Sequence, residues 1–236
     1  MTEITLNNVE KLNTKMNEAF KQLRTNIIFC GDDIKTIAIT SCMANEGKSE
    51  VSFNLVKSLA EAGKRVVLVD ADIRKSVFFS RYQPDKSVNG LSHYLAGLDK
   101  LDNILCQTNI KNVYMIFAGK TVPNPSEILS SSKFSAMIAS LEKVFDYVII
   151  DCPPLGAVID AAVIASHSDG AVIVIENNKI SYKTAQKVKA QLVKSGCRIL
   201  GAVLNKVDTS AKGYYSRYGS YYGGYGGYGG YYGNEE

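Results

Sequence analysis

A chain of 236 residues is long enough for one sizeable α/β domain, with or without appended segments. Its 46% hydrophobic and 21% charged residues are typical of a globular protein, and a net charge of +4 is too small to indicate nucleic-acid binding. Five cysteines without a CxxC pair argue against a zinc site and a disulfide framework. No secretory signal and no apolar run near the roughly 18 residues of a membrane span are present, so a cytoplasmic protein is expected.

Residues 9–29 carry the first helical pattern. Its apolar side chains recur at steps of three and four, and therefore lie on one stripe: Val9, Leu12, Met16, Phe20, Leu23 and Ile27. Because this helix precedes the first strand, we expect it to pack outside the basic sheet unit or against a partner. From spacing alone, its charged residues Glu18, Lys21 and Arg24 would form a solvated face.

The first strand, loop and helix surround the sequence EGKS at 46–49. An apolar run at 37–39 leads into this loop, and a helical pattern follows from Val51. Successive backbone N–H groups and the positive end of the following helix would bind phosphate there. Lys48 would reach the β/γ-phosphates and Ser49 would hold Mg²⁺.

A second strand, at 65–70, is expected after a helix over 49–62 that ends near Gly63. The strand is apolar throughout, as are strands buried on both faces of a parallel sheet. It ends in Asp70, and Asp72 follows two residues later. Ligands bind outside the carboxyl ends of strands in open α/β sheets, so both acids should face the phosphate loop. A capped loop is the alternative, but beside a phosphate loop Mg²⁺ binding or catalysis is favoured.

The middle of the chain is less strongly patterned. A short helix is expected near 91–95, a strand at 113–117, and one helix from the turn at 123–127 to about residue 143. His93 and His167 are isolated histidines without neighbouring ligands, so a structural role is expected for each.

Another apolar strand, at 147–151, ends in Asp151 and is followed at once by Cys152 and two prolines. Such a strand beside a phosphate loop is a Walker B arrangement, whose carboxylate orients Mg²⁺ or its waters. Further strands are expected at 170–175 and 198–204, with a helix over 183–195 between them. The alternation predicts an α/β fold with a doubly wound, mostly parallel sheet.

The expected organisation has three parts: an N-terminal helical segment at 1–29, a single domain at 30–208, and a tail at 209–236. The tail holds nine of the fourteen tyrosines and is rich in glycine, so it should be disordered. Stacking on RNA is disfavoured because Arg217 is its one basic residue after Gly213, and two glutamates cancel that charge. A tail of accessible phenols is a good phosphoryl acceptor.

Together these segments resemble the bacterial tyrosine kinases (BY-kinases) of capsule and exopolysaccharide synthesis, specifically the cytoplasmic kinase of the two-protein Gram-positive type. The resemblance covers nearly the whole chain. Besides the phosphate loop and the tyrosine tail, it rests on EAFKQLRTNI at 18–27, VVLVDADIRK at 66–75, PNPSEIL at 123–129, VIIDCPP at 148–154 and ILGAVLNKVD at 199–208. It implies an ATP-dependent protein-tyrosine autokinase on a P-loop NTPase fold, similar to the partition and division-site ATPases.

The resemblance also implies site residues. Lys48 and the loop amides would hold phosphate, Asp151 would orient the metal's water, and Asp70 is the candidate to accept the phenol proton. The implied catalytic residues are Lys48, Asp70, Asp72 and Asp151. The implied nucleotide contacts are Asn45, Glu46, Gly47, Lys48, Ser49, Glu50 and Asn205. The implied metal ligands are Ser49, Asp72 and Asp151.

The implied phosphoryl acceptors are Tyr215, Tyr218, Tyr221, Tyr222, Tyr225, Tyr228, Tyr231 and Tyr232. By resemblance, the kinase would be activated by the cytoplasmic tail of a membrane adaptor protein and reset by a cognate phosphotyrosine phosphatase. It would form a homo-oligomeric ring through Glu18, Lys21 and Arg24, in which one subunit's tail enters a neighbour's site. It would be cytoplasmic and recruited to the inner face of the membrane by the adaptor.

Five positions depart from the common motifs. Cys42 replaces the first loop glycine and is expected to be a small, inert loop residue. Ala44 and Asn45 stand where the family has proline and glycine, and asparagine tolerates the left-handed conformation. Glu50 replaces a threonine, and its charge would weaken nucleotide binding. Lys21 replaces an arginine and loses bidentate pairing, which would weaken assembly.

Two rival functions fit parts of the chain. The sequence NKVD at 205–208 matches the guanine-reading motif of GTPases, but Pro154 stands where a GTPase needs glycine, so Asn205 is interpreted as an adenine contact by resemblance. The second rival is a nucleotide-switched scaffold of the partition-ATPase type that does not phosphorylate protein. Such a switch has no use for nine tail tyrosines.

Overall fold

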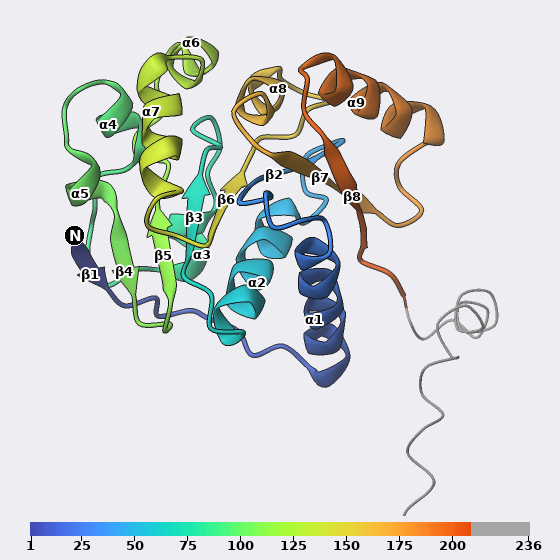
Figure 1. Ribbon diagram of the computed structural model, residues 1–236, viewed down its shortest axis with the longest axis horizontal. Helices are drawn as coiled ribbons and strands as arrows, with labels where there is room; N and C mark the ends of the chain where they lie inside the picture. Colours follow the sequence, from blue (N-terminus) through green and yellow to red (C-terminus); the bar gives the residue numbers. More distant parts are fainter. Residues whose placement is uncertain (209–236) are drawn as a thin grey trace, which may run out of the picture. The chain divides into compact units, whose positions relative to one another are not determined.

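The computed structural model describes residues 1–208. The expectations for the tail at 209–236 and its acceptor tyrosines concern residues outside this part. Met1–Asn205 form one compact unit, in which a central sheet is covered by helices on both faces (Figure 1).

Within residues 1–208, eight strands form one sheet in the order β1-β4-β5-β3-β6-β2-β7-β8. Neighbouring strands run parallel except β4 and β5, which are antiparallel. The strands are β1 (Thr2–Ile4), β2 (Thr36–Ser41), β3 (Val66–Asp70), β4 (Cys106–Thr108), β5 (Val113–Ile116), β6 (Tyr147–Asp151), β7 (Gly170–Glu176) and β8 (Ile199–Asn205). The α/β, doubly wound and mostly parallel sheet expected from the sequence is confirmed.

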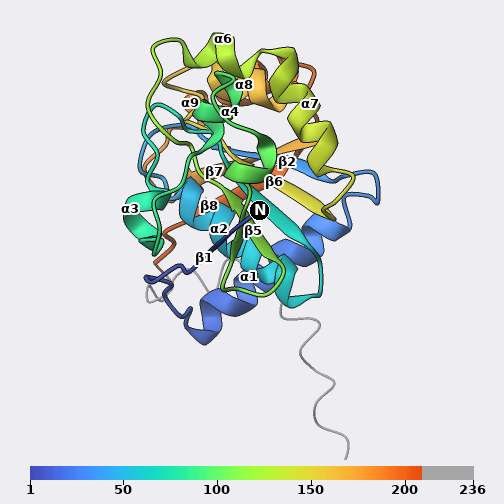
Figure 2. The ribbon, with the colours of Figure 1, turned by 90° about the vertical axis from the view of Figure 1, so that its left-hand side faces the viewer.

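The helices form two layers. They are α1 (Thr14–Ile28), α2 (Lys48–Glu61), α3 (Phe78–Tyr82), α4 (Leu91–Leu95), α5 (Leu101–Ile104), α6 (Pro125–Leu129), α7 (Ser132–Leu141), α8 (Asp160–Ala165) and α9 (Tyr182–Lys194). Helices α1, α2 and α3 pack on one face of the sheet, and the others pack on the opposite face. Figure 2 shows the sheet between α1 and α2 on one side and α6 to α9 on the other.

The alternation of side chains along each strand supplies both cores. In β2, Ile37 and Ile39 point into the core with α1 and α2, whereas Ala38 points into the core on the opposite face. Both cores are apolar, which is why the central strands read as continuous hydrophobic runs. Within residues 1–208, no helix is both long and apolar enough to cross a membrane.

The first residue of two helices is set by the capping residue before it. It differs from the start that apolar periodicity predicts. Helix α1 begins at Thr14 and not near residue 9, because the side chain of Asn13 accepts a hydrogen bond from the N–H of Met16. Helix α2 begins at Lys48, one residue before the expected start, with Gly47 as its cap.

The expected long helix after residue 123 is two helices, α6 and α7. The side chain of Ser131 caps α7 by accepting a hydrogen bond from the N–H of Phe134. Strands β1 and β4 were not expected, because three residues are too few to show a period. They pair with each other in parallel and bring the first residues of the chain into the sheet.

Candidate active site

Three strand ends meet at one edge of the sheet. Strand β6 lies between β3 and β2, and the register pairs Asp70 with Asp151 and Ile39 with Asp151. Because these strands are parallel, their carboxyl ends bring both acids beside the loop that follows β2. The sheet order thus brings the two acidic strand ends to the phosphate loop, as the sequence predicted.

The loop at 42–47 joins β2 to α2. Gly47 caps α2 with φ 88°, and a Cβ there would lie 2.1 Å from Nδ2 of Asn205, so glycine is required. Asn45 also has a left-handed backbone, with φ 66°. The expectation that this asparagine adopts a glycine-like conformation is confirmed. The loop therefore leads through two left-handed residues into the N-terminus of a 14-residue helix, and a helix N-terminus favours a bound anion.

Two polar side chains connect this loop to the neighbouring strands by hydrogen bonds. The Nδ2 group of Asn205, at the end of β8, donates to the carbonyl of Glu46 at 2.9 Å. The buried Glu46 carboxylate accepts hydrogen bonds from the N–H of Met43 and from the N–H of Glu176, the latter at 3.0 Å. Both side chains thus hold the loop to β7 and β8, a role that the sequence did not reveal.

Cys42 begins the loop and is fully buried. Burial, with a smaller contribution from the charge of Glu46, raises the pKa of its thiol to about 11. The thiol is therefore protonated at neutral pH, as expected of an inert packing residue.

Lys48 lies at the centre of an acid cluster, which we define as Lys48, Asp70, Asp72 and Asp151. Its Nζ atom is 3.0 Å from Oδ2 of Asp151 and 3.2 Å from Oδ2 of Asp72. Burial alone would lower the pKa of Lys48, but the charges of Asp151 and Asp72 outweigh it and leave the pKa above its usual value. The ammonium group therefore stays charged.

Ser49 and Ser52 bind the two oxygens of Asp151. The Ser49 hydroxyl donates to Oδ2 at 2.7 Å, and the Ser52 hydroxyl donates to Oδ1 at 2.9 Å. Both serines lie on the first turns of α2, so the helix orients the carboxylate of the neighbouring strand. Ser52 was not predicted as a site residue, and its place one helical turn after Lys48 is the signal that could have indicated it.

Asp70 is the most unusual acid of the cluster because it is fully buried. Its Oδ2 atom accepts hydrogen bonds from the Ser76 hydroxyl and, at 3.4 Å, from the N–H of Ala118, while Oδ1 has no partner within the described residues. Burial and the nearby charge of Asp151 raise the pKa of Asp70 to about 7. This carboxyl group can therefore both hold and release a proton near neutral pH.

Glu50, whose charge was expected to oppose nucleotide binding, points toward α3. Its Oε2 atom lies 3.6 Å from Nη1 of Arg81, and both side chains are about half exposed. The negative charge of Glu50 is therefore partly balanced by Arg81.

The residues expected to form ring contacts lie on α1. Lys21 pairs with Glu18 at 2.7 Å, one turn apart, and Nη1 of Arg24 donates to the carbonyl of Ser58 on α2 at 2.7 Å. Arg24 thus joins α1 to α2. A role of these residues in assembly stays a prediction.

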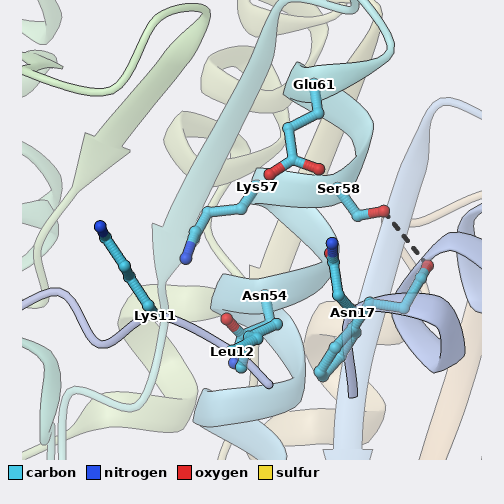
Figure 3. Close-up of a pocket in the computed structure, with 8 residues that line it drawn as sticks. Lys11, Leu12, Asn17, Asn54, Lys57, Ser58 and Glu61 are labelled. Atoms are coloured by element: carbon cyan, nitrogen blue, oxygen red, sulfur yellow. Dashed lines mark hydrogen bonds between the residues drawn. The ribbon is translucent and has the colours of Figure 1, made fainter. Parts of the chain in front are cut away.

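A hollow of about 240 Å³ lies beside these helices, with side chains of Lys11, Asn17, Lys57 and Glu61 around it (Figure 3). Its wall includes Ser58, whose hydroxyl donates to the carbonyl of Phe20 at 3.2 Å. None of its lining residues belongs to the acid cluster, so it is separate from the candidate active site.

A second charged network involves a residue of the loop after β3 and was not predicted from the sequence. The guanidinium group of Arg74 binds the buried carboxylate of Asp160 through Nε at 2.6 Å and Nη2 at 3.1 Å. The hydroxyl of Ser126 donates to the same carboxylate at 2.5 Å. Burial would raise the pKa of Asp160, but the hydrogen bonds from Arg74 and Ser126 keep it below its usual value. Spacing could not have paired residues so far apart in the chain.

The acid cluster fits a magnesium site. Within residues 1–208, no three His, Cys, Asp or Glu side chains form a complete metal site. Mg²⁺ usually takes one or two carboxylates and completes its coordination with waters and substrate phosphates. Ser49, Asp72 and Asp151, beside a buried acid with a partnerless oxygen, are the residues that would hold the ion.

The fold and the site define a P-loop nucleotide-binding domain. Residues 34–198 match the family model described as an AAA domain. The chain is also similar to the septum site-determining protein MinD from Pyrococcus horikoshii OT3, which was crystallised with Mg-ADP, with TM-score 0.61, 28% identity and coverage of 72% of this chain and 69% of that one.

The most specific similarities lie within one group of kinases. The chain is 42% identical over 207 residues to tyrosine-protein kinase CpsD of Streptococcus agalactiae, covering 87% of this chain and 90% of CpsD. It is similar to the crystal structure of the chimerical protein CapA2B2, with TM-score 0.78, 28% identity and coverage of 86% and 94%. The chain belongs to the bacterial tyrosine-kinase family, as its motifs predicted.

Proposed function

We propose that this kinase transfers the γ-phosphoryl group of ATP to tyrosines at 209–236 of a neighbouring copy, and that this autophosphorylation regulates capsular or exopolysaccharide synthesis and export. The observation that carries the proposal is the acid cluster. A buried ammonium group lies between two carboxylates at the phosphate loop, beside a third carboxyl group that can take a proton near neutral pH. The relatives named tyrosine-protein kinases support the choice of acceptor.

Binding and orientation would come from the loop and from α2. The loop amides and Lys48 would contact the phosphates, and Ser49 with Asp72 would hold Mg²⁺ while Asp151 orients its water. Bound Mg²⁺ would supply positive charge to the β- and γ-phosphate oxygens. The braces from Glu46 and Asn205 keep the loop in shape, so little reorganisation is needed when nucleotide binds. An adenine contact by Asn205 stays a prediction.

Asp70 would accept the acceptor's proton. The phenol oxygen forms a bond to the γ-phosphorus, the bond from that phosphorus to the oxygen of ADP breaks, and the phenol proton passes to the carboxylate. A free tyrosine has a pKa of about 10, and an ordinary aspartate about 4, so an acid raised to about 7 is a better matched base.

We further propose the partners implied by the family. The cytoplasmic tail of a membrane adaptor would recruit the kinase to the inner face of the membrane and activate it, and a phosphotyrosine phosphatase would reset it. Similarity to the chimerical protein CapA2B2 supports the adaptor. Assembly into a ring would use Glu18, Lys21 and Arg24, and the pairing of all three within α1 and α2 supports weak assembly without the adaptor.

Mass spectrometry of the tail after incubation with Mg·ATP tests the activity. We expect phosphotyrosine in the wild-type tail and none in Lys48→Met, which lacks the phosphate-binding ammonium group. Mixing Lys48→Met with a full-length variant whose tail tyrosines are all phenylalanine tests transfer between chains, because only the inactive chain then carries acceptors. ATP hydrolysis with unmodified tyrosines, even after addition of an adaptor's activating segment, would instead support a partition-type ATPase scaffold. Replacing ATP by GTP tests the GTPase alternative.

A further inference from the structure

A cavity of about 540 Å³ lies next to the acid cluster. The loop after β3, helix α3, helix α4 and the end of β5 line it. We call it the basic groove and define it by six of its lining residues: Lys75, Ser76, Phe79, His93, Phe117 and Lys120. No aspartate or glutamate is among its lining residues within the described chain.

The wall of the basic groove is also the hydrogen-bonding shell of Asp70. The hydroxyl of Ser76 and the N–H of Ala118 both donate to Oδ2 of Asp70, and both residues line the groove. A peptide bound in the groove would therefore pass beside the group that we propose as the proton acceptor.

The groove is electropositive. Lys75 and Lys120 are exposed, and neither forms a salt bridge within residues 1–208. Two acids lie nearby, but neither forms a salt bridge with these lysines within residues 1–208: Asp72 pairs with Lys48 and accepts a hydrogen bond from the N–H of Lys75, and Asp99 accepts a hydrogen bond from the groove residue Asn89. The two ammonium groups are thus available to an anion.

The groove also offers an aromatic surface. Phe79 is 44% exposed, and its ring meets Phe117 edge-on with 5.7 Å between centroids. Inorganic phosphate would use the lysines but not this ring. A ligand that combines an aromatic ring with a dianion would use both.

We propose that the basic groove binds a phosphotyrosine of the tail of a second copy, next to the tyrosine presented at Asp70. The proposal rests on the proposed function, because that activity makes the phosphotyrosines. Each carries a charge of about −1.5 to −2 and can form new charge-assisted hydrogen bonds with lysine. Tyrosine recurs every third residue at Tyr222, Tyr225, Tyr228 and Tyr231, so a shift by three residues presents the next acceptor in the same register. Phosphorylation of the cluster is then progressive, with each product holding the tail for the next transfer.

Peptide binding tests the groove without any kinase activity. The protein is the full chain with all nine tail tyrosines changed to phenylalanine, in saturating Mg·ADP so that the phosphate loop is blocked. The probes are two labelled peptides with the sequence of residues 219–230, one of them with phosphotyrosine in place of Tyr225, and the readout is fluorescence anisotropy.

We expect the phosphopeptide to bind at least about tenfold more tightly, since hydrogen bonds to charged groups are the stronger kind. The double change Lys75→Ala and Lys120→Ala should abolish this preference, and Phe79→Ala should weaken it. Lys143→Ala, which alters an exposed lysine outside the groove, should leave it unchanged. Equal affinity for both peptides, or a preference that survives the double change, would overturn the proposal.

A time course of intact masses tests the consequence for the reaction. With the native tail, the lysine double variant should add the first phosphate at the wild-type rate but accumulate multiply phosphorylated forms more slowly. An unchanged distribution of phosphates per chain would contradict progressive phosphorylation. If the wild type adds no phosphate at all, the proposed function fails, whereas the peptide experiment still decides whether the groove binds phosphotyrosine.

Discussion

Two charged networks leave the end of β3 and are built in opposite ways. In the acid cluster, one ammonium group faces three carboxyl groups, and Oδ1 of Asp70 has no partner within the described chain. In the second network, one guanidinium group faces one carboxylate, and Arg74 and Ser126 bind both oxygens of Asp160. The first network has excess negative charge, and the second is balanced.

This difference separates a binding site from a structural brace. A buried carboxylate without a partner is costly, so the acid cluster is stabilised when a cation or a proton arrives. The Arg74 network already has its charge balanced and its hydrogen bonds formed, so it needs no ligand. It ties the loop that carries Asp72 to α6 and α8, and thereby holds the first network in place.

The largest expected effect comes from Asp70→Asn, which removes one ionisable carboxyl group from the acid cluster but keeps its shape. Loss of the proposed base should lower tail phosphorylation by about 10²- to 10⁴-fold, the usual contribution of general-base catalysis. The measurement is the initial rate of phosphate incorporation. Asp102→Asn, an exposed change on α5, is the matched control and should have the wild-type rate.

The same variant should alter how stability depends on pH. The pKa of Asp70 rises from 3.8 to about 7 on folding, so the native state retains a proton that the unfolded state loses, and stability falls as pH increases through this range. A pKa difference of one between the two states corresponds to about 1.4 kcal/mol. Asparagine cannot ionise, so Asp70→Asn should unfold at a higher temperature than the wild type at about pH 8 and lose this advantage near pH 4. The same pH dependence in both proteins would contradict a buried, proton-holding Asp70.

An intermediate effect is expected when the balanced network is broken. Arg74→Ala leaves the Asp160 carboxylate buried without its counter-ion, which should cost about 2 kcal/mol of unfolding free energy after allowing for the 40% exposure of the arginine side chain. Denaturant unfolding measures it. Adding Asp160→Asn removes the uncompensated charge and should restore part of the stability. A double variant no more stable than Arg74→Ala alone would show that the charge pair is not what the network contributes.

The smallest effect is expected from Glu50→Thr. Its carboxylate is half-exposed and lies 3.6 Å from Arg81, so stability should change by less than about 0.5 kcal/mol and ATP affinity by less than about twofold. Titration with a fluorescent ATP analogue measures the affinity. Glu46→Gln is the contrasting variant and should have the larger effect of the two. Unlike Glu50, the Glu46 carboxylate is buried, and it accepts two backbone hydrogen bonds of the loop region. A large gain in affinity for Glu50→Thr would show that its charge acts on the nucleotide.

Local features of the site could be predicted because neighbouring residues encode them. The apolar runs before Asp70 and Asp151 mark buried strands, and parallel strands bring their carboxyl ends to one edge. The start of α1 at Thr14 could not be predicted from apolar spacing, which already begins at Val9. The break between α6 and α7 depends on the cap formed by Ser131, which competes with a continuous helix only through one side-chain hydrogen bond.

The sequence by itself determined the strand, loop and helix of the phosphate site, the two acidic strand ends and the left-handed backbone at Asn45, since periodicity and conformational preference act over a few residues. Only the tertiary structure decided how the charges are paired. Which strands are adjacent, and in what register, determines the hydrogen bond from Asn205 to Glu46 and the one from Arg74 to Asp160. The same arrangement leaves one oxygen of Asp70 without a partner in the described part of the chain. The two pairs are separated by 159 and 86 residues in the chain, and the low dielectric of the interior strengthens each interaction.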